Sequence, residues 1–474
     1  MSNPLFDFGM IGLGVMGRNF LLNMADHGFS VVGLDKDNQK ALSLEKEATK
    51  GTIVKGVTNA GDFINALKKP RSIMMLVPAG KPVDAVIEEF LPLLDKGDIL
   101  IDGGNSHYTD TVKRIRYLEE KGIHFMGMGV SGGEKGARFG PSIMPGGDQD
   151  AWRTVQPMLE AVSAKVNGSP CVAYLGKDAA GHYVKMVHNG IEYAIMQLIS
   201  ETYMLMHRGL GLNNDQLHGV FKKWNEGNLQ SYLIEITRDI FMQQDDKTNN
   251  RLVDMILDEA GAKGTGMWTS QDAMSLHYPI PLIDIAVSMR DLSVYKEERT
   301  RAEGIYGNPY QNLPVDKEAF IAQLHDALYF AVINCYAQGL GMIQKGSAAL
   351  GMDIPLSEVV RIWRGGCIIR SVLLDKFFVI YSKTKDMPNI LLSEFVSKEL
   401  QGNVRQIRAV IVASINAGYP VPGLSASLNY FDSYRRKHLP VNLLQAQRDY
   451  FGSHTYQRID EPGIFHTEWK ENNE

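Results

Sequence analysis

The sequence predicts a doubly wound α/β domain, then a large all-helical domain and an extended C-terminal tail. Up to about residue 178, short runs of strand-forming residues alternate with helical patterns, which is typical of a mainly parallel sheet with helices on both faces. From residue 179 long helical periods replace the strand pattern. Neither period is visible in 441–474, which carries Gly, Pro and several aromatic residues. We therefore expect three parts, 1–178, 179–440 and 441–474.

Six strands are expected in the first part, and two long helices mark the second. The expected strands are 6–13, 29–35, 71–77, 97–104, 124–131 and 171–176, with helical stretches such as 59–69 between them. The expected helices are 183–206 and 317–343. In the first of these helices, Glu192, Gln197, Ser200 and Glu201 interrupt the apolar run, which a membrane span would tolerate poorly. This run predicts a buried helix and no membrane partner.

Length, charge and cysteine content exclude several classes of protein. The 474 residues exceed what one core usually organises, and 44% apolar content is enough to bury two or more domains. The net charge is -5 with both signs interspersed, so no basic face for nucleic acid is expected. Cys171, Cys335 and Cys367 show no paired spacing, which suits buried thiols in a reducing compartment. Without a secretory signal pattern or a metal-site histidine spacing, we expect a cytoplasmic protein that holds no metal.

A glycine-rich loop follows the first expected strand. It comprises Gly12, Leu13, Gly14, Val15, Met16 and Gly17, which match the spacing GxGxxG between a strand and a helical run. Gly12 permits a tight turn, Gly14 lets the backbone approach a diphosphate, and Gly17 allows the helix to pack closely on the strand. Asp35 ends the next strand, where a carboxylate can bind a ribose. A glycine turn without a ligand would not require this context, so the motif predicts a Rossmann-type dinucleotide site.

One helical face collects four polar residues. Lys185, His188, Asn189 and Glu192 fall at i, i+3, i+4 and i+7, which places them on one side of a helix. Lys185 and Glu192 would lie about 10 Å apart along its axis. They could flank a small substrate with a cation and a carboxyl group, as general acid and base chemistry requires. The simpler interpretation is a solvated polar face, which is the usual outcome for such a stripe.

Several longer segments decide between these interpretations. They are GLGVMGRN, IDGGNS, GVSGGEKGA, PSIMPGG, GHYVKMVHNGIEY, ILDEAGAKGTGMWT, GCIIR and RDYFGSHTYQRID, and together they span essentially the whole chain. The set closely resembles the 6-phosphogluconate dehydrogenases. This resemblance implies oxidation and decarboxylation of 6-phosphogluconate to ribulose 5-phosphate with NAD(P)+ as the cofactor.

The resemblance also implies a role for each matching position. Lys185 would take the proton of the substrate C3 hydroxyl as hydride leaves C3, and Glu192 would later protonate C1. The first role requires a lysine with a lowered pKa, and the second requires a carboxyl group with a raised pKa. The residues expected to position the sugar acid and the nicotinamide are Asn105, Ser131, Gly132, Gly133, His188 and Asn189. Those expected around the substrate phosphate are Tyr193, Lys263, Thr265, Arg290, Arg448 and His454.

The tail and the cofactor site carry further implications of the resemblance. In the family, the tail with its Arg and His reaches the neighbouring subunit, which implies a homodimer with tail exchange. Val77 and Asn105 are expected beside the cofactor. Asp35, Lys36 and Asp37 stand where most members hold the NADP 2′-phosphate with an Asn-Arg pair.

Three departures from the family pattern bear on this site. Pro78 replaces a lysine near the cofactor, and Ala179 replaces a glycine before the catalytic helix, where we expect little effect. Two carboxylates against one lysine favour NAD+ over NADP+, although Lys36 could still pair with a 2′-phosphate. Dual use of the two cofactors is the alternative.

Two other functions remain open at this point. Another β-hydroxyacid dehydrogenase, such as one acting on 3-hydroxyisobutyrate, would share the glycine loop and the helix lysine, but those chains are shorter and lack the KGTGMWT and tail segments. A catalytically inactive dinucleotide-binding protein would keep the loop and lose the acid and the base freely. The presence of both Lys185 and Glu192 argues against the second alternative.

Overall fold

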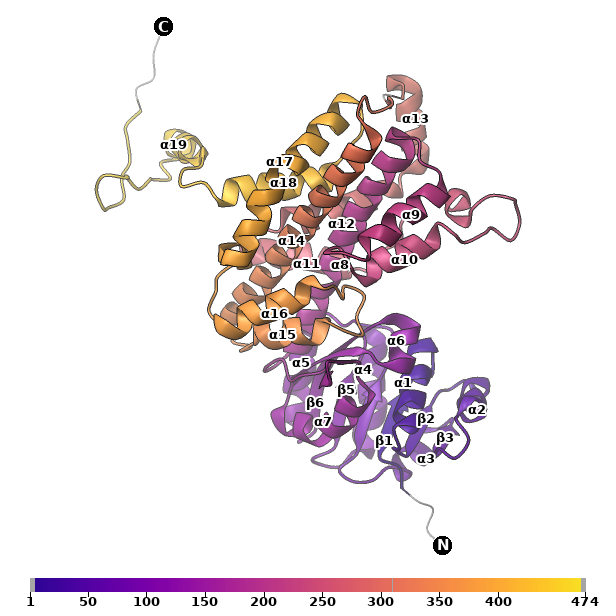
Figure 1. Ribbon diagram of the computed structural model, residues 1–474. Coiled ribbons are helices and arrows are strands. Elements are labelled where there is room, and N and C mark those ends of the chain that lie inside the picture. The colour runs from indigo at the N-terminus through magenta and orange to yellow at the C-terminus, as the bar shows by residue number, and fades with distance from the viewer. Residues whose placement is uncertain (1–4, 309, 470–474) are drawn as a thin grey trace. The chain divides into compact units, whose positions relative to one another are not determined.

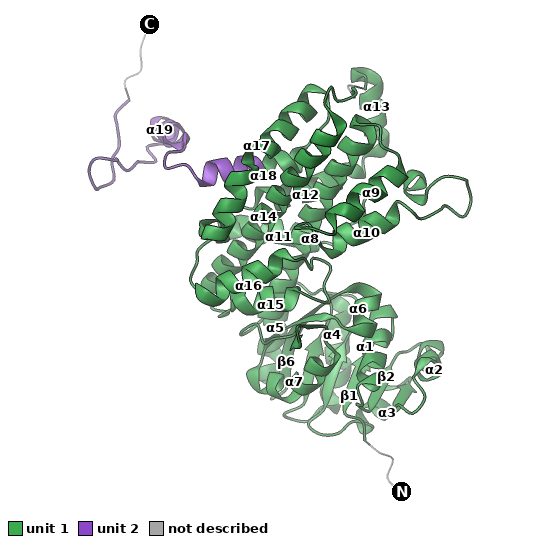
Figure 2. Ribbon diagram, in the orientation of Figure 1, with its two compact units in different colours: residues 1–427 green, residues 428–474 purple. Residues whose placement is uncertain are grey.

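The computed structural model describes residues 5–308 and 310–469 of the chain (Figure 1). Residues 1–427 form one compact unit, and residues 428–474 form a second (Figure 2). The first unit contains both the sheet and the main set of helices. The expected boundary near residue 178 therefore lies inside this unit and remains a prediction about domains.

Seven strands form the main sheet, in the order β3-β2-β1-β4-β5-β6-β7. They are β1 (Phe8–Ile11), β2 (Val31–Leu34), β3 (Val54–Val57), β4 (Ser72–Met75), β5 (Ile99–Asp102), β6 (His124–Ser131) and β7 (Ser142–Gly147). Every neighbouring pair from β3 to β6 is parallel, and β7 runs antiparallel to β6. A separate two-stranded ladder joins β8 (Lys165–Val166) and β9 (Ser169–Pro170). The predicted doubly wound, mainly parallel sheet is confirmed.

Helices cover both faces of the main sheet because its central strands are apolar on both sides. Met10 of β1 packs into a core with Phe20 of the following helix, and the next residue, Ile11, packs into a second core with Phe63 and Ile87. The helices of this part are α1 (Val15–Asp26), α2 (Asn38–Glu47), α3 (Ala60–Asn65), α4 (Lys81–Phe90), η1 (Leu91–Leu93), α5 (Tyr108–Glu119), α6 (Gly133–Phe139) and α7 (Gln149–Val162). The order of the sheet reverses between β1 and β4, which is where such folds bind dinucleotides.

One expected strand is wrong, and two strands of the main sheet were not predicted. Residues 171–176 form no strand, because Val172 joins Ile143 only in an isolated bridge. The neighbour of β6 is instead β7, whose Gly and Pro content hides its strand character in the sequence. The edge strand β3 was missed for a similar reason, since its four residues include Lys55 and Gly56 and three of them are only partly buried.

The rest of the first unit is helical. Its elements are α8 (Ala180–Met204), η2 (Leu205–Gly209), α9 (Asn214–Trp224), α10 (Tyr232–Ile240), η3 (Leu252–Met255), α11 (Thr265–Ser275), α12 (Pro281–Ser293), α13 (Lys296–Tyr306), α14 (Lys317–Leu350), α15 (Leu356–Trp363), α16 (Leu373–Lys383), η4 (Ile390–Leu392), α17 (Glu394–Asn416) and α18 (Pro422–Tyr434), which extends into the second unit. The long helices expected at 183–206 and 317–343 are confirmed as α8 and α14, and both are largely buried.

Close packing between these helices depends on small residues. A Cβ at Gly190 of α8 would lie 2.7 Å from the Thr269 side chain of α11, whose hydroxyl donates to the Met186 carbonyl at 2.9 Å. The three cysteines are buried and unbridged, as expected for buried thiols. In the described ranges, none of the helices combines the length and apolar character that crossing a membrane would need.

The second unit contains a helix that the sequence pattern did not predict. In the segment 441–474, which shows no clear period, Val441–Gly452 forms α19 (Figure 2). Residues 455–469 fold back on α19 through Asp449, whose carboxylate accepts hydrogen bonds from the backbone of Thr455, the backbone of Thr467 and the side chains of His466 and Trp469. Although burial opposes it, these bonds lower the pKa of Asp449 to about 2. The helix was missed because its apolar residues do not face a core of this unit: Val441, Leu443 and Phe451 are exposed.

Candidate active site

The glycine-rich loop has the geometry that a dinucleotide requires. Gly12 has φ +93°, and a Cβ there would lie 2.6 Å from the Leu76 carbonyl oxygen. A Cβ at Gly17 would collide with the Gly12 carbonyl oxygen, so only glycine lets α1 begin this close to β1. A Cβ at Gly14 would meet no atom within 4 Å, and Gly14 caps α1 without any side-chain hydrogen bond. This helix N-terminus, with Leu13, Val15 and Met16 around it, fits a diphosphate.

The adenosine side of this loop is dominated by Asp35. Its Oδ2 accepts from the Leu13 amide at 2.9 Å and from Lys40 at 3.4 Å, and its Oδ1 accepts from the Asp37 amide at 3.0 Å. Asp37 in turn caps α2 at the Gln39 amide. Lys36 is turned to Glu89, 3.0 Å away, and its side chain is 84% exposed. The cation beside Asp35 is therefore Lys40, which was not among the predicted site residues.

A buried network shapes the loop that carries Asn105. Asp102, at the end of β5, accepts from the Gly104 amide at 3.0 Å and from the Ser106 hydroxyl at 2.6 Å. A Cβ at Gly104 would lie 3.3 Å from the Val77 carbonyl oxygen, and the Val77 side chain also borders Gly12. The predicted residues Val77 and Asn105 thus lie on neighbouring loops at the carboxyl ends of β4 and β5, beside the glycine-rich loop. Asn105 itself is exposed.

Lys185 lies on α8 where this helix crosses β6. Its side chain runs over Gly129, where a Cβ would lie 2.8 Å from the Lys185 Cγ and would collide with its Cβ. The residue is only 6% exposed. Burial lowers the pKa of Lys185, while Glu192 and Cys367 act in the opposite direction. A lysine in this environment loses its proton more readily than one in water, as a general base must.

His188 and Ser131 connect α8 to the loop after β6. The Ser131 hydroxyl lies 3.3 Å from the His188 Nε2, and the His188 Nδ1 lies 3.2 Å from the Asn189 side-chain oxygen. Burial and then the charge of Lys185 lower the pKa of His188 well below its ordinary value, so its ring is neutral. A neutral ring leaves one nitrogen able to accept a hydrogen bond, which suits a residue that orients a hydroxyl group.

The segment 365–370 closes this side of the site, and none of its residues was predicted as a site residue. The Ile368 amide donates to the Ser131 hydroxyl at 3.4 Å. Gly132 has φ +122°, and a Cβ there would collide with the Gly366 carbonyl oxygen. Gly133 also has a positive φ, +63°, at the start of α6. The GCIIR motif was the signal that could have placed these residues, since it was among the segments of the resemblance.

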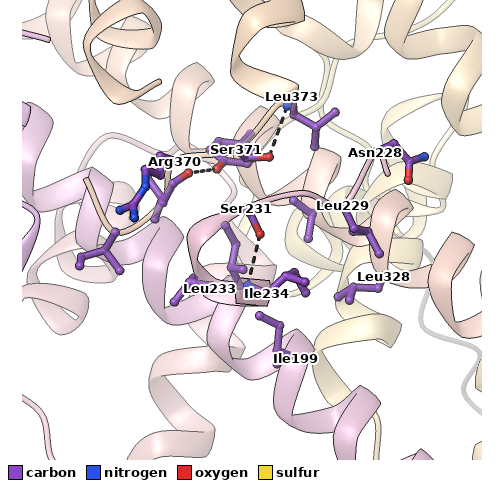
Figure 3. Close-up of a pocket in the computed structure, with 15 residues that line it drawn as sticks. Ile199, Asn228, Leu229, Ser231, Leu233, Ile234, Leu328, Arg370, Ser371 and Leu373 are labelled. Carbon is purple, nitrogen blue, oxygen red and sulfur yellow. Dashed lines mark hydrogen bonds between the residues drawn. The ribbon is translucent and has the colours of Figure 1, made fainter. Parts of the chain in front are cut away.

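Behind this segment lies a small enclosed cavity (Figure 3). It holds about 20 Å³, and its wall is formed largely by apolar side chains such as Ile199, Leu229 and Leu233. This volume suits about one water molecule and is far too small for a sugar phosphate. Arg370 stacks on the Tyr232 ring at 3.8 Å and donates to the Cys367 carbonyl at 2.9 Å. The cavity is therefore a packing defect and not part of the candidate substrate site.

Glu192 and Tyr193 extend the site along α8 toward α11 and α12. Burial raises the pKa of Glu192, and Lys185 and Arg290 oppose this shift. The Arg290 guanidinium stacks on the Tyr193 ring at 3.5 Å, and a Cβ at Gly266 would lie 2.6 Å from the same ring. Thr265 is buried at the start of α11 and Lys263 is exposed just before it. Tyr193, Thr265 and Arg290 are therefore brought together next to Glu192.

Two of the predicted substrate residues belong to the second unit. Arg448 donates to Gln445 at 3.1 Å within α19, and the His454 ring packs edge-on against Phe451. These two side chains belong to a different unit from the site on α8, so their part in it stays a prediction.

Comparisons with known proteins find the same family over the sheet-containing part of the chain and over the helical part that follows it. The family model of the NAD binding domain of 6-phosphogluconate dehydrogenase matches residues 7–176, and that of the 6-phosphogluconate dehydrogenase C-terminal domain matches residues 181–469. A relative from Bacillus subtilis is 49% identical over 462 residues, covering 97% of this chain and 98% of its own. The chain belongs to the 6-phosphogluconate dehydrogenase family. The full-length match separates it from the shorter β-hydroxyacid dehydrogenases.

Other relatives in this family extend the comparison. The Bacillus subtilis protein is named an NADP(+)-dependent, decarboxylating 6-phosphogluconate dehydrogenase. A Lactococcus lactis 6-phosphogluconate dehydrogenase is 46% identical over 465 residues, 98% of either chain. The solved structure of the Plasmodium falciparum 6-phosphogluconate dehydrogenase superposes with a TM-score of 0.94 at 45% identity, covering 98% of this chain and 100% of that one. That enzyme is described in complexes with NADP+ and with 6-phosphogluconate.

Proposed function

We propose that this protein oxidises and decarboxylates 6-phosphogluconate to ribulose 5-phosphate and carbon dioxide, with Lys185 as base and Glu192 as acid. The observation that carries this proposal is the pair itself. A buried lysine with a lowered pKa and a partly buried carboxyl group with a raised pKa lie on one face of α8, with Ser131, His188 and Asn189 beside them. Two groups whose pKa values are shifted toward each other are the usual arrangement for a base and an acid in one site.

Lys185 starts the reaction. In its neutral form it accepts the proton of the C3 hydroxyl while the hydride leaves C3, which converts the alcohol into a ketone. A bound nicotinamide dinucleotide would supply the acceptor for this hydride. The neutral ring of His188 and the Ser131 hydroxyl, which lie 3.3 Å apart, would hold the substrate hydroxyls through this step.

Glu192 completes the reaction. The ketone at C3 makes the sugar acid a β-keto acid. As its carboxylate leaves as carbon dioxide, the protonated Lys185 returns its proton to the C3 oxygen, and an enediol remains. Glu192 then donates its proton to the carbon that becomes C1 of the product while Lys185 takes back the hydroxyl proton, and the product is ribulose 5-phosphate. Because burial raises the pKa of Glu192, a larger fraction of this carboxyl group carries the needed proton than would be the case in water.

Cations next to Glu192 support binding of the phosphate group. Arg290 lies against Tyr193, and Thr265 is the first residue of a helix whose N-terminus favours an anion. Lys263 is exposed beside that N-terminus, where it can add a charge. We propose that Arg448 and His454 of a partner subunit complete this phosphate site in a homodimer. The exposed apolar residues of α19, among them Leu443 and Phe451, are consistent with docking on such a partner.

We propose that the protein prefers NAD+ over NADP+. The Asp35 carboxylate lies at the end of β2 with only the partial compensation of Lys40 at 3.4 Å, and Lys36 is already paired with Glu89. A 2′-phosphate would meet net negative charge here, whereas a ribose hydroxyl would meet an acceptor. The three buried, unbridged cysteines are consistent with a reducing, cytoplasmic location.

The assay of the purified protein with 6-phosphogluconate tests this function. We expect reduced nicotinamide and carbon dioxide to form in equal amounts, and ribulose 5-phosphate to accumulate with them. Gluconate, which lacks the phosphate, and 3-hydroxyisobutyrate are the controls and should react far more slowly. Reduction without carbon dioxide, or faster turnover of 3-hydroxyisobutyrate, would contradict the proposal.

A further inference from the structure

One carboxylate lies where three segments of the site meet. Asp272 is on α11, about two turns after Thr265, and is 8% exposed. The Tyr108 hydroxyl donates to its Oδ1 at 2.5 Å, and the Tyr183 hydroxyl donates to its Oδ2 at 2.8 Å. We propose that Asp272 is a positioning residue that holds the Asn105 loop and the Lys185 helix in register for hydride transfer. This inference rests on the function proposed above.

Each of the two tyrosines lies within three positions of a predicted site residue in the sequence. Tyr108 is the first residue of α5 and lies three positions after Asn105. The start of that loop is held by Asp102, so the bond from Tyr108 to Asp272 fixes its other end. Tyr183 lies two positions before Lys185 on α8. The Asp272 carboxylate therefore links the cofactor side of the site, the catalytic helix and the helix that begins at Thr265.

The surroundings are built around these two bonds. The rings of Tyr108 and Tyr183 pack edge to face, 5.1 Å apart at 81°, and His107 packs edge-on against Trp268 of α11 at 4.9 Å. A Cβ at Gly346 of α14 would collide with the Tyr183 hydroxyl, so the absence of a side chain at residue 346 leaves the space that this hydroxyl occupies. Burial and then Asp272 raise the pKa of both phenols, which keeps both hydroxyls protonated as donors.

The carboxylate is suited to this role because it accepts two hydrogen bonds at once through different oxygens. Asparagine would keep one such acceptor, and leucine would keep none at a similar size. Loss of both bonds would free the Asn105 loop from α11, and a displacement of about 1 Å between reacting groups can lower a rate about a hundredfold. None of these three side chains is among the residues that we expect to touch the substrate or the cofactor. They would therefore affect the rate only by positioning the Asn105 loop and Lys185.

Four variants of the full-length enzyme test the inference. Asp272→Leu removes both acceptors, Asp272→Asn keeps one, and Tyr108→Phe removes one donor. Tyr117→Phe is the matched control, since it removes an exposed hydroxyl that bonds to Glu88 from the far end of the same helix α5. The measurements are kcat with 6-phosphogluconate and the kinetic isotope effect with substrate deuterated at C3.

We expect kcat to fall about tenfold or more in Asp272→Leu and by a smaller factor in Asp272→Asn and Tyr108→Phe, with Tyr117→Phe unchanged. The isotope effect should rise as kcat falls, because a misaligned hydride transfer becomes rate-limiting. A lower kcat with an unchanged isotope effect in a folded variant would overturn the inference, because hydride transfer would then not be the step that is misaligned. If Asp272→Leu does not fold, Tyr108→Phe decides. A wild-type enzyme inactive on 6-phosphogluconate would refute the proposed function, whereas normal variants of an active enzyme would refute only the role of Asp272.

Discussion

The side chain of Lys185 lies across the backbone of Gly129, so that any side chain at residue 129 would occupy the space of the lysine stem. Gly129 is a residue of β6, so the backbone of this strand packs against the proposed base and limits where its side chain can lie. The orientation of the Lys185 amine toward a substrate therefore depends on a glycine that bears no reactive group.

Gly129→Ala is expected to lower kcat at least about tenfold, because the new Cβ displaces Lys185 while all reactive groups remain. Overpacking of this kind typically destabilises a protein by about 1–3 kcal/mol. Steady-state kinetics together with thermal unfolding would separate the two effects. Gly219→Ala on α9 is the control, since a Cβ there meets no atom within 4 Å. Equal kcat values for the two variants would contradict the prediction.

The pH profile of kcat/KM should be bell-shaped. The direction in which each limb falls follows from the protonation states that the reaction requires. Lys185 must be neutral, so the rate falls when pH drops through its pKa, which burial has lowered. Glu192 must carry a proton, so the rate falls when pH rises through its pKa, which burial has raised. The two limbs belong to the coupled pair and not to either residue alone.

The variant Glu192→Gln tests this assignment of the two limbs. Its residual activity should lose the alkaline limb, because glutamine does not ionise. The acidic limb should move to lower pH, because Glu192 raises the pKa of Lys185 and that effect is lost. An unchanged bell in this variant would show that other groups control the profile.

Much of the fold could be predicted because the sheet strands are buried on both faces and read as continuous apolar runs. The helix face of Lys185 and Glu192 could be predicted from spacing alone. The strand β7 could not, because Pro145, Gly146 and Gly147 carry none of the usual strand signal. Asp272 was missed because its partner Tyr108 is brought to it by tertiary packing, which the order of the sequence does not display. Lys40 was missed although it lies close to Asp35 in the sequence, because the turn between β2 and α2 that brings the two side chains together has no regular period.

The C-terminal segment should contribute to substrate binding. Truncation before Arg448 is expected to raise the KM for 6-phosphogluconate and to weaken the dimer, because the phosphate loses charge-assisted hydrogen bonds. Arg448→Gln should raise KM with little change in the dimer. Arg458→Gln is a matched control in the same unit, because Arg458 pairs with Asp460 there. Substrate saturation and sedimentation would measure both effects, and an unchanged KM in the truncated protein would remove the tail from the site.

The cofactor preference should follow the charge around Asp35. We expect a higher kcat/KM with NAD+ than with NADP+, and we expect Asp35→Asn with Lys36→Arg to move the ratio toward NADP+, because a carboxylate is lost and a fork-shaped cation is gained. The Bacillus subtilis relative, named NADP(+)-dependent, offers a natural comparison in the same assay. A clear NADP+ advantage in the unaltered protein would refute the argument from Asp35.

The most direct test of the account is the turnover of Lys185→Met and Glu192→Gln with 6-phosphogluconate. Each variant removes one proton-transfer group and keeps a side chain of similar size on the same face of α8. We predict that each variant loses at least about a hundredfold in kcat while its circular dichroism and unfolding midpoint stay close to those of the unaltered enzyme. Near-normal turnover in either folded variant would contradict this prediction.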